Sequence, residues 1–101
     1  MDFKPLATID EIPEGCGRCF EMEGREIAVF RLKGEFYAIS NVCPHQGGPL
    51  AEGRIEGDTV TCPWHHWHFN IKTGISPVNP KLKIQSYPLK QQEDQLFIAI
   101  L

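Results

Sequence analysis

The sequence has no apolar run long enough to cross a bilayer, which takes about 20 residues as a helix. It also has no secretory signal in its first 15 residues, MDFKPLATIDEIPEG, where acidic residues and a proline stand in place of basic and apolar regions. We therefore expect a cytoplasmic protein that is not embedded in a membrane.

Positive charge is also scarce. Ten lysine and arginine residues stand against thirteen aspartate and glutamate residues, a formal net charge of −3 at pH 7, and the basic residues form no cluster. Proteins that bind nucleic acids usually neutralise the phosphates with a basic face. The composition therefore argues against a nucleic-acid partner.

Cysteine is limited to four residues in a chain of 101. A chain of this length is expected to form one domain, residues 1–101, around a single small core, without disulfides. Because thiols stay reduced in the cytoplasm, the cysteines are better explained as metal ligands or buried small residues than as a disulfide framework.

No helical period extends beyond a turn or two, and the apolar runs are short. Residues 19–22, 25–32 and 35–40 are rich in β-branched and aromatic residues and are separated by Glu23-Gly24 and Lys33-Gly34. Such two-residue connections predict tight turns. This region is therefore expected to form a three-stranded antiparallel meander.

Further strands and turns are expected later in the chain: strands at residues 68–71, 83–89 and 96–101, and turns at residues 72–74 and 93–94. Residues 9–15 can form a single helical turn. The pattern predicts an all-β fold, either a small sandwich or a partly open barrel.

Residues 41–80 differ in character from the rest of the chain. They hold five of the eight prolines, five of the nine glycines, both tryptophans and all four histidines. Proline donates no backbone hydrogen bond and glycine has no side chain to pack, so the segment cannot be mostly sheet. A metal centre would hold it together, because metal–ligand bonds that form only in the folded state add to the folding free energy.

Two short stretches of this segment, CPH and CPWH, each supply one cysteine and one histidine: Cys43 with His45, and Cys62 with His65. Two cysteines and two histidines can hold zinc in a tetrahedral site. Zinc-finger spacing, however, pairs cysteine with cysteine and histidine with histidine. One ligand of each kind from each loop favours a two-metal cluster, a [2Fe–2S] centre with sulfur and nitrogen ligands.

The longer stretches CPHQGGPL and CPWHHWHFN resemble the two ligand boxes of the Rieske iron–sulfur proteins. The resemblance covers nearly the whole chain and implies an antiparallel β-sandwich base with a small cluster-binding subdomain at about residues 41–80. It also implies one [2Fe–2S] cluster per chain, with Cys43 and Cys62 on the inner iron and His45 and His65 on the outer, more exposed iron.

The same resemblance indicates which subfamily of Rieske proteins the chain is similar to. Respiratory and photosynthetic Rieske proteins carry an extra cysteine in each box, joined as a disulfide, at positions that match Gly48 and Trp64 here. They also carry a serine and a tyrosine whose hydroxyls hydrogen-bond the cluster, at positions that match Trp67 and Phe69. Without these bonds to stabilise the reduced cluster, the resemblance implies a Rieske-type ferredoxin with a low potential, about −150 mV or somewhat above.

Two pairs of neighbouring residues are expected to support the cluster. Gly47 and Gly48 would let the backbone turn closely around it and aim their N–H groups at sulfur. Trp64 and Trp67 would shield its edge from water. For Trp67, a place in the loop core is an equal alternative.

His66 stands where the family commonly has glycine, directly after the second ligand histidine. It could compete with His65 as a ligand, but the C-x2-H spacing favours His65. We expect His66 to be exposed near the point where the electron leaves. His68 is expected to lie at the surface or to make a structural hydrogen bond.

Cys16 and Cys19 form a C-x2-C pair outside the segment described above. By itself such a pair suggests redox or zinc chemistry. No βαβ pattern accompanies it, and the four cluster ligands are already supplied elsewhere. Both cysteines are therefore expected to be small residues of a turn and a strand start.

The resemblance implies an electron carrier and not an enzyme in its own right. Such a ferredoxin accepts one electron from a flavin-dependent reductase that uses NADH or NADPH and passes it to a terminal oxygenase, for example that of an aromatic-ring dioxygenase. One alternative is the small Rieske subunit of an assimilatory NAD(P)H nitrite reductase, bound to its large subunit. The other is a zinc-stabilised binding module without a redox role.

The redox partner is expected to dock at the exposed histidine tip through a small apolar area with mildly complementary charge. A contact of this size suits a brief encounter better than tight binding. The candidate residues for this surface are Pro49, Leu50, Trp64, His66 and Trp67.

Overall fold

The computed structural model describes residues 2–44, 47–64 and 66–100. The elements in chain order are β1 (Phe3–Thr8), the 3-10 helix η1 (Ile9–Glu11), β2 (Gly17–Met22), β3 (Arg25–Leu32), β4 (Glu35–Ser40), the 3-10 helix η2 (Leu50–Glu52), β5 (Arg54–Glu56), β6 (Thr59–Thr61), β7 (His68–Asn70), β8 (Ser86–Tyr87), β9 (Leu89–Gln92) and β10 (Gln95–Ala99). In this described part, no helix has the length and apolarity to span a membrane.

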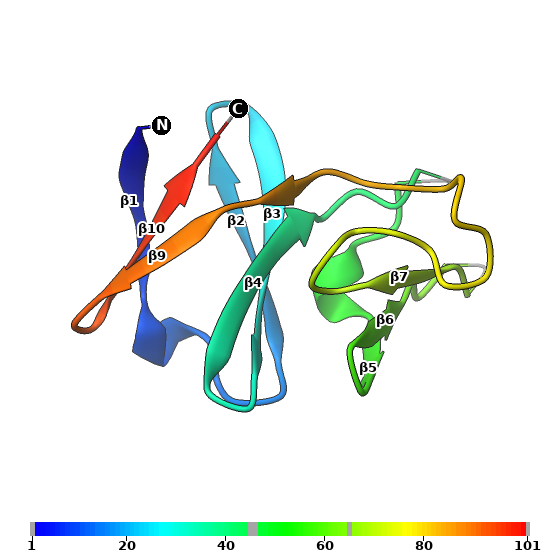
Figure 1. The fold of residues 1–101 in the computed structure, drawn as a ribbon, viewed down its shortest axis with the longest axis horizontal. Coiled ribbons are helices and arrows are strands. Elements are labelled where there is room, and N and C mark those ends of the chain that lie inside the picture. Colours follow the sequence, from blue (N-terminus) through cyan, green and yellow to red (C-terminus); the bar gives the residue numbers. More distant parts are fainter. Residues whose placement is uncertain (1, 45–46, 65, 101) are drawn as a thin grey trace.

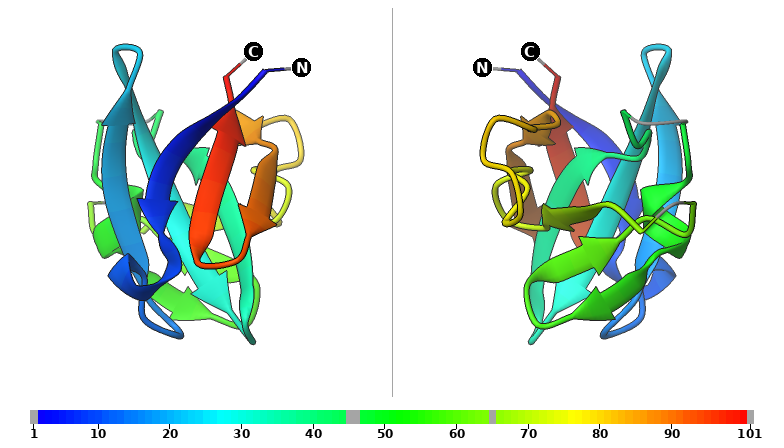
Figure 2. Two further views of the ribbon diagram at one scale, coloured as in Figure 1. Left: turned by 90° about the vertical axis from the view of Figure 1, so that its left-hand side faces the viewer. Right: turned by 90° about the vertical axis from the view of Figure 1, so that its right-hand side faces the viewer.

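The strands form three sheets, with the orders β1-β10-β9, β2-β3-β4-β8 and β5-β6-β7. The four-stranded sheet lies between the other two (Figure 1). It faces β1-β10-β9 as one half of a sandwich (Figure 2). On its other side, β5-β6-β7 and the segments around them form what we call the loop lobe, residues 41–84. All the strand pairings are antiparallel, which confirms the expected all-β antiparallel sandwich.

Strand β3 is buried on both faces because it lies in the middle sheet. Ile27 and Val29 pack into a core shared with β1-β10-β9, whereas Ala28 and Phe30 pack into a second core shared with the loop lobe. A strand covered on both sides has a continuous apolar run in its sequence instead of an alternating one. The two cores correct the expectation of a single small core.

The expected meander is confirmed, because β2 pairs with β3 and β3 with β4. Both of its turns have positive φ at two consecutive residues, 51° and 76° at Glu23 and Gly24, and 51° and 79° at Lys33 and Gly34. Positive φ at both central residues is typical of a type I′ turn, whose twist matches that of the flanking strands. The first strand begins at Gly17, two residues before the expected start.

Proline explains two differences from the expected strands. Pro5 lies inside β1, a strand that the sequence did not predict, and the pairing of β1 with β10 is irregular between Pro5 and Ala7. An edge strand tolerates a residue without an N–H. Pro88 divides the strand expected at residues 83–89, which is therefore wrong as a single strand: β8 pairs with β4, and β9 pairs with β10 in the opposite sheet.

The remaining elements follow the expectations with one addition. The strand expected at residues 68–71 is confirmed as β7, the strand expected at 96–101 as β10, and the helical turn as η1. The hairpin of β5 and β6 was not expected, because each strand has only three residues and β5 carries charges at both ends.

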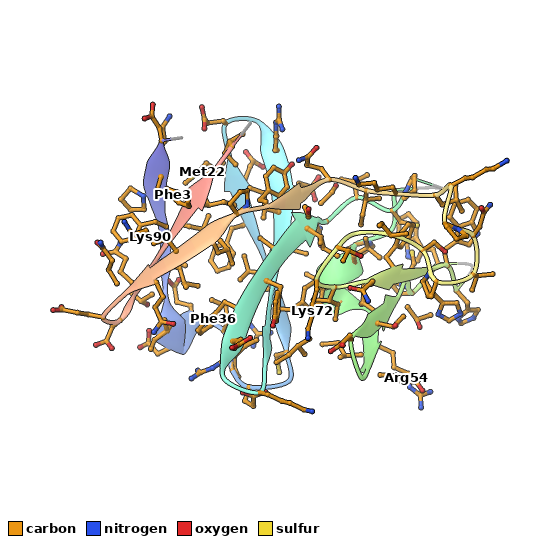
Figure 3. The ribbon with its side chains drawn as sticks, in the orientation of Figure 1. Phe3, Met22, Phe36, Arg54, Lys72 and Lys90 are labelled. Atoms are coloured by element: carbon orange, nitrogen blue, oxygen red, sulfur yellow. The ribbon has the colours of Figure 1, made fainter. Side chains whose placement is uncertain are left out.

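Two cation–π contacts at the surface connect neighbouring parts of the fold (Figure 3). The Lys90 ammonium, on β9, lies 5.9 Å from the centroid of the Phe3 ring on β1. The Lys72 ammonium, in the loop lobe, lies 5.5 Å from the centroid of the Tyr37 ring on β4. Contacts of this kind contribute about 0.5–1 kcal/mol each at exposed sites, so they assist the packing of the sheets without determining it.

Candidate metal centre

The two cysteine boxes form loops that are closed in the same way. The Cys43 N–H donates to the Gly48 carbonyl at 3.0 Å, and the Cys62 N–H donates to the Trp67 carbonyl at 2.7 Å. In both loops the partner is the fifth residue after the cysteine. The first loop connects β4 to η2 and the second connects β6 to β7, so each cysteine follows a strand that is anchored in a sheet.

The structure brings the thiols of Cys43 and Cys62 together. The two side chains lie close enough for the Cys43 thiol to raise the pKa of the Cys62 thiol, and neither forms a disulfide. The two residues are 1% and 0% exposed and belong to the core that also holds Phe69 and Leu50. Two buried thiols side by side can donate two sulfur ligands to one metal ion.

The pKa of the Cys62 thiol bears on whether this pair can bind a metal. Burial raises the pKa of the Cys62 thiol, the Trp64 N–H that donates to its Sγ at 3.4 Å partly lowers it, and the Cys43 thiol raises it further. A cysteine must lose its proton to bind iron or zinc. Because burial opposes the bare thiolate here, the positive charge of a metal is what would make it favourable. The two thiols therefore fit a metal such as the iron of an iron–sulfur cluster, and they would suit zinc as well.

The positions that match the disulfide of respiratory Rieske proteins lie next to each other. A Cβ atom added at Gly48 would stand 3.3 Å from the Cβ of Trp64 and 2.6 Å from the Cys62 Sγ. Disulfides join Cβ atoms that are about 3.5–4.5 Å apart. The two positions are therefore close enough to correspond to those cysteines, although a side chain at Gly48 would crowd the Cys62 Sγ in this structure, and neither glycine nor tryptophan can form the bond.

One expectation about the loop backbone is wrong. The Gly47 N–H does not point at sulfur, because it donates to the Cys43 carbonyl at 2.7 Å. In the described part of the two loops, the Trp64 N–H reaches a cysteine sulfur. From the sequence we expected Trp64 to act through its ring. The hydrogen bond from its backbone N–H was not foreseen, because it depends on how the loop folds back on Cys62.

His45 and His65, the expected histidine ligands, lie outside the described residues. Within the described ranges, the candidate centre contains the two thiols, and no group of three or more metal-binding side chains is found. His66 is exposed, as expected, and has a φ of 57°. This left-handed conformation favours glycine, which gives a physical reason for the glycine that is common there in the family.

His68 makes the structural hydrogen bond that was expected of it. Its Nδ1 lies 2.9 Å from the hydroxyl Oγ1 of Thr61, across the β6–β7 pairing. Thr61 is the residue before Cys62. This bond therefore helps to fix the strand from which the second ligand loop starts.

The exposure expected of the residues at the tip is confirmed in part. Trp64 is 49% exposed, whereas Leu50 is completely buried and cannot contact a partner. The expectation for Leu50 failed because the CPHQGGPL box gives no sign that its last residue turns inward into the core. Three further large apolar residues of the loop lobe are exposed among the described residues: Val42 at 41%, Ile75 at 36% and Val78 at 75%.

Cys16 and Cys19 are too far apart to act as a dithiol. Cys16 lies directly before β2 and Cys19 lies within it, so three extended residues separate their Cα atoms by roughly 10 Å. A disulfide needs Cα atoms closer than about 7 Å. Burial, and next the carboxylate of Glu26, raise the pKa of the Cys19 thiol, which keeps it protonated and unreactive.

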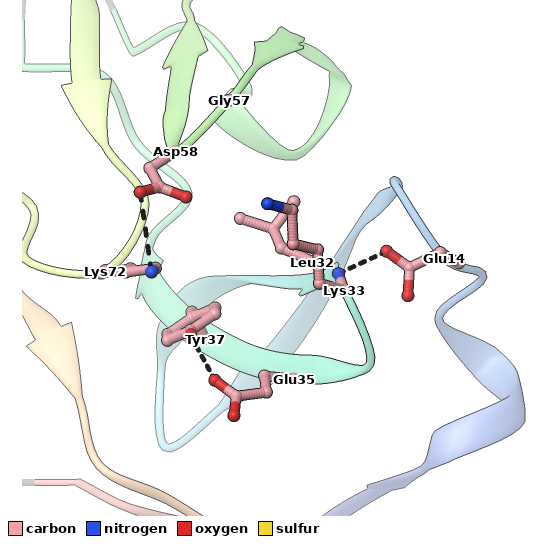
Figure 4. A pocket seen from close by; sticks show the side chains of 8 residues that line it. All are labelled: Glu14, Leu32, Lys33, Glu35, Tyr37, Gly57, Asp58 and Lys72. Atoms are coloured by element: carbon pink, nitrogen blue, oxygen red, sulfur yellow. Dashed lines mark hydrogen bonds and ion pairs between the residues drawn. The ribbon is translucent and has the colours of Figure 1, made fainter.

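A cleft of about 450 Å³ separates the β3–β4 turn from the β5–β6 turn (Figure 4). Several of its polar and charged groups are paired within the chain. The Lys72 ammonium lies 3.6 Å from an oxygen of Asp58, and the Tyr37 hydroxyl donates to Glu35 at 2.7 Å. The carboxylate of Glu14 accepts two backbone N–H bonds from the β3–β4 turn, at 2.6 and 2.7 Å. We interpret this cleft as a seam between the sandwich and the loop lobe.

Comparison with known proteins points to one family. The chain matches the family model of the Rieske [2Fe-2S] domain over residues 2–88. It is 38% identical over 95 residues to the ferredoxin component of the naphthalene 1,2-dioxygenase/salicylate 5-hydroxylase systems of Ralstonia sp., covering 93% of this chain and 91% of the relative. It is 35% identical to the naphthalene 1,2-dioxygenase ferredoxin component of Pseudomonas aeruginosa, covering 89% of this chain and 88% of the relative.

Solved structures have the same fold. The ferredoxin of carbazole 1,9a-dioxygenase from Nocardioides aromaticivorans IC177 superimposes with a TM-score of 0.87 at 27% identity, covering 98% of both chains. A chain in a complex of reduced oxygenase and oxidized ferredoxin of carbazole 1,9a-dioxygenase gives 0.84 at 26% identity, covering 96% of this chain and 92% of that one. A nitrite reductase NADPH small subunit gives 0.88 at 19% identity, covering 99% and 100%, which shows a shared fold alone.

Proposed function

Because the chain belongs to the Rieske [2Fe-2S] family, we propose that it is the ferredoxin component of an oxygenase system. It takes one electron from an NAD(P)H-dependent flavin reductase and passes it to a terminal oxygenase, and it is not an enzyme by itself. The similar ferredoxin components of dioxygenase systems support this role, since the alignment spans most of both chains.

The observation that carries the proposal is the pair of buried, free thiols of Cys43 and Cys62. They lie in two loops that are closed by the same kind of backbone hydrogen bond. We assign Cys43 and Cys62 to the inner iron of the cluster, and His45 and His65 to the outer iron. The cluster-binding subdomain comprises about residues 41–80 of the single domain 1–101. We disfavour His66 as the alternative ligand, because its side chain is exposed and its left-handed backbone conformation forms part of the turn.

A Rieske cluster, when bound, stores and releases one electron. The residues of this chain control its surroundings. Cys43 and Cys62 are buried, so water does not reach their sulfur atoms. The Trp64 N–H stabilises negative charge on the Cys62 sulfur. Phe69 is fully buried beside the thiols and has no hydroxyl to donate. Among the described residues, the Trp64 N–H donates to a cysteine sulfur in an otherwise apolar core, and such surroundings agree with a low reduction potential.

We place the docking surface for the redox partner around the second loop. Trp64 and His66 are exposed there, and Val42 and Val78 add apolar area from the first loop and from the segment after β7. Small apolar contacts with few charges suit a complex that forms and separates at each electron transfer. The protein acts in the cytoplasm, without nucleic-acid or membrane partners.

The first experiment is electron paramagnetic resonance of the dithionite-reduced protein, with iron and acid-labile sulfide assayed on the same sample. A Rieske-type signal with about two irons and two sulfides per chain supports the mixed ligation. An electron-paramagnetic-resonance-silent, colourless protein with one zinc per chain would refute it and leave the zinc-stabilised binding module. Turnover of a reductase and oxygenase pair from the same source, dependent on this protein, then tests the partners.

The second candidate is the small subunit of a nitrite reductase, which the shared fold permits. In that role the protein would be a fixed subunit of an enzyme complex. Its isolation as a monomer that exchanges electrons with a separate reductase opposes this candidate. Co-purification with a large subunit that contains sirohaem and flavin would favour it over the oxygenase system.

A further inference from the structure

Asn41 is a buried polar residue at the base of the first ligand loop, only 2% exposed. Burial of an amide is favourable only when its polar groups have partners. The Asn41 Oδ1 accepts from the Ala51 N–H at 2.7 Å, and its Nδ2 donates to Glu26 Oε1 at 3.2 Å. The backbone of Asn41 also donates to the Glu26 carbonyl at 2.9 Å and accepts from the Leu50 N–H at 2.8 Å.

These four bonds join strand β3, the start of the first ligand loop and helix η2. The same loop is closed further on by the bridge between Val42 and Pro49 and by the bond from the Cys43 N–H to the Gly48 carbonyl. Asn41 therefore stands at the neck of the loop, two residues before Cys43. At this neck the entering and leaving segments are fastened to each other and to the middle sheet.

We propose that Asn41 is a positioning residue, which holds the Cys43 sulfur in place for the cluster by fixing the neck of the loop against β3. This inference rests on the proposed function, because it takes Cys43 as a cluster ligand. Residues that fix the orientation of metal ligands influence the reduction potential of the metal centre as well as the affinity for the metal. Asn41 does so indirectly, through the backbone of η2 and the carboxylate of Glu26.

The sharpest test acts at Glu26, which is exposed and lies outside the loop. Glu26→Gln removes the charge but keeps an oxygen that accepts from Asn41, whereas Glu26→Ala removes both. Since both variants are neutral at this position, a difference between them reports the hydrogen bond and not the charge. We expect Glu26→Gln to keep the wild-type line shape of the reduced electron paramagnetic resonance spectrum. Glu26→Ala should give shifted or broadened g values and a midpoint potential that differs from that of Glu26→Gln.

A second test removes the asparagine itself, with a matched control elsewhere in the loop lobe. Asn70 accepts the backbone N–H bonds of Lys72 and Thr73 at 2.8 and 3.1 Å, in a turn that leads away from the ligand loops. Asn41→Ala and Asn70→Ala should both lower the unfolding temperature, because the first leaves the Ala51 N–H and the second leaves two backbone N–H groups without their side-chain acceptor. Only Asn41→Ala should alter the spectrum and the potential and speed the loss of iron to a chelator.

Two results would overturn the inference. The first is an identical spectrum and potential for Glu26→Ala and Glu26→Gln, which decides the question even where Asn41→Ala fails to hold a cluster. The second is a spectral change in Asn70→Ala equal to that in Asn41→Ala, because general loosening of the lobe would then account for both. Failure of the proposed function is a separate result: either the wild-type protein gives no Rieske signal, or it gives one but supports no turnover.

Discussion

Replacing Gly53 by alanine should loosen the second ligand loop from a distance. Gly53 follows η2 with an ordinary φ of −75°, so its requirement for glycine comes from close packing and not from backbone strain. A Cβ added there would lie 2.3 Å from the Thr61 carbonyl oxygen and 2.8 Å from a methyl group of Val60. Thr61 directly precedes Cys62, so the added Cβ would press against β6, the strand that leads to a cysteine of the candidate metal centre.

The magnitude follows from the distance. To reach an ordinary contact of 3.4 Å from 2.3 Å, the β6 backbone would have to retreat by about 1.1 Å. Overpacking costs about 1–3 kcal/mol, and we expect the upper half of this range because the contacted oxygen belongs to the backbone. At roughly 4–8 °C per kcal/mol for a domain of this size, the unfolding temperature should fall by roughly 8–24 °C.

The assay is thermal unfolding by circular dichroism, together with iron content per chain after purification. Gly57→Asn is the matched control at the other end of β5. Gly57 has a φ of 60° and open space around an added Cβ, and asparagine tolerates this left-handed conformation, so its effect should stay within about 0.5 kcal/mol. A Gly53→Ala protein that melts within about 3 °C of wild type and keeps its full iron content would refute the argument.

Three further outcomes are expected. Cys43→Ser should abolish the Rieske spectrum while Cys16→Ser leaves it intact, and loss of the cluster in the second variant would contradict the ligand assignment. Leu50→Ala should lower the free energy of unfolding by about 2–5 kcal/mol in urea denaturation, because the side chain is completely buried; a loss below about 1 kcal/mol would place Leu50 at the surface after all. The backbone N–H groups of the β3–β4 turn hold the pKa of Glu14 below its usual value, so its contribution is present above the unfolded-state pKa and lost as the pH falls through the folded-state pKa. Glu14→Gln should therefore reduce the urea midpoint at about pH 7, and the reduction should shrink as the pH falls through the folded-state pKa; an equal reduction throughout would contradict this.

The sequence predicted the elements whose signals are local. The turns at Glu23-Gly24 and Lys33-Gly34 connect strands of high β-propensity, and the structure confirms the resulting meander. Local signals mislead where proline acts through its position in a sheet. Pro5 is compatible with β1 only because that strand lies at a sheet edge, and the change of sheet at Pro88 cannot be inferred without knowing both partners.

The candidate site divides in the same way. The spacing of Cys43 and Cys62 within two similar boxes was sufficient to predict that their thiols meet, and the structure places them in contact. Contacts between residues that no motif marks were not predictable. The neck at Asn41 joins positions 26, 41 and 51, and the fit of Gly53 against Thr61 depends on a hairpin of two three-residue strands.

The pairing of β1 with β10 has a practical consequence for attaching this protein to other molecules. Phe3 pairs with Ala99, so both ends of the described chain emerge side by side at the sandwich, on the side of the molecule away from the loop lobe (Figure 1). A fused reductase, or a tag that anchors the protein to an electrode, could therefore be linked at either end while the ligand loops stay accessible. A flexible linker would convert the encounter into an intramolecular one at an effective concentration in the millimolar range. The direction in which the strands run thus makes this fold suited to tethered electron-transfer chains.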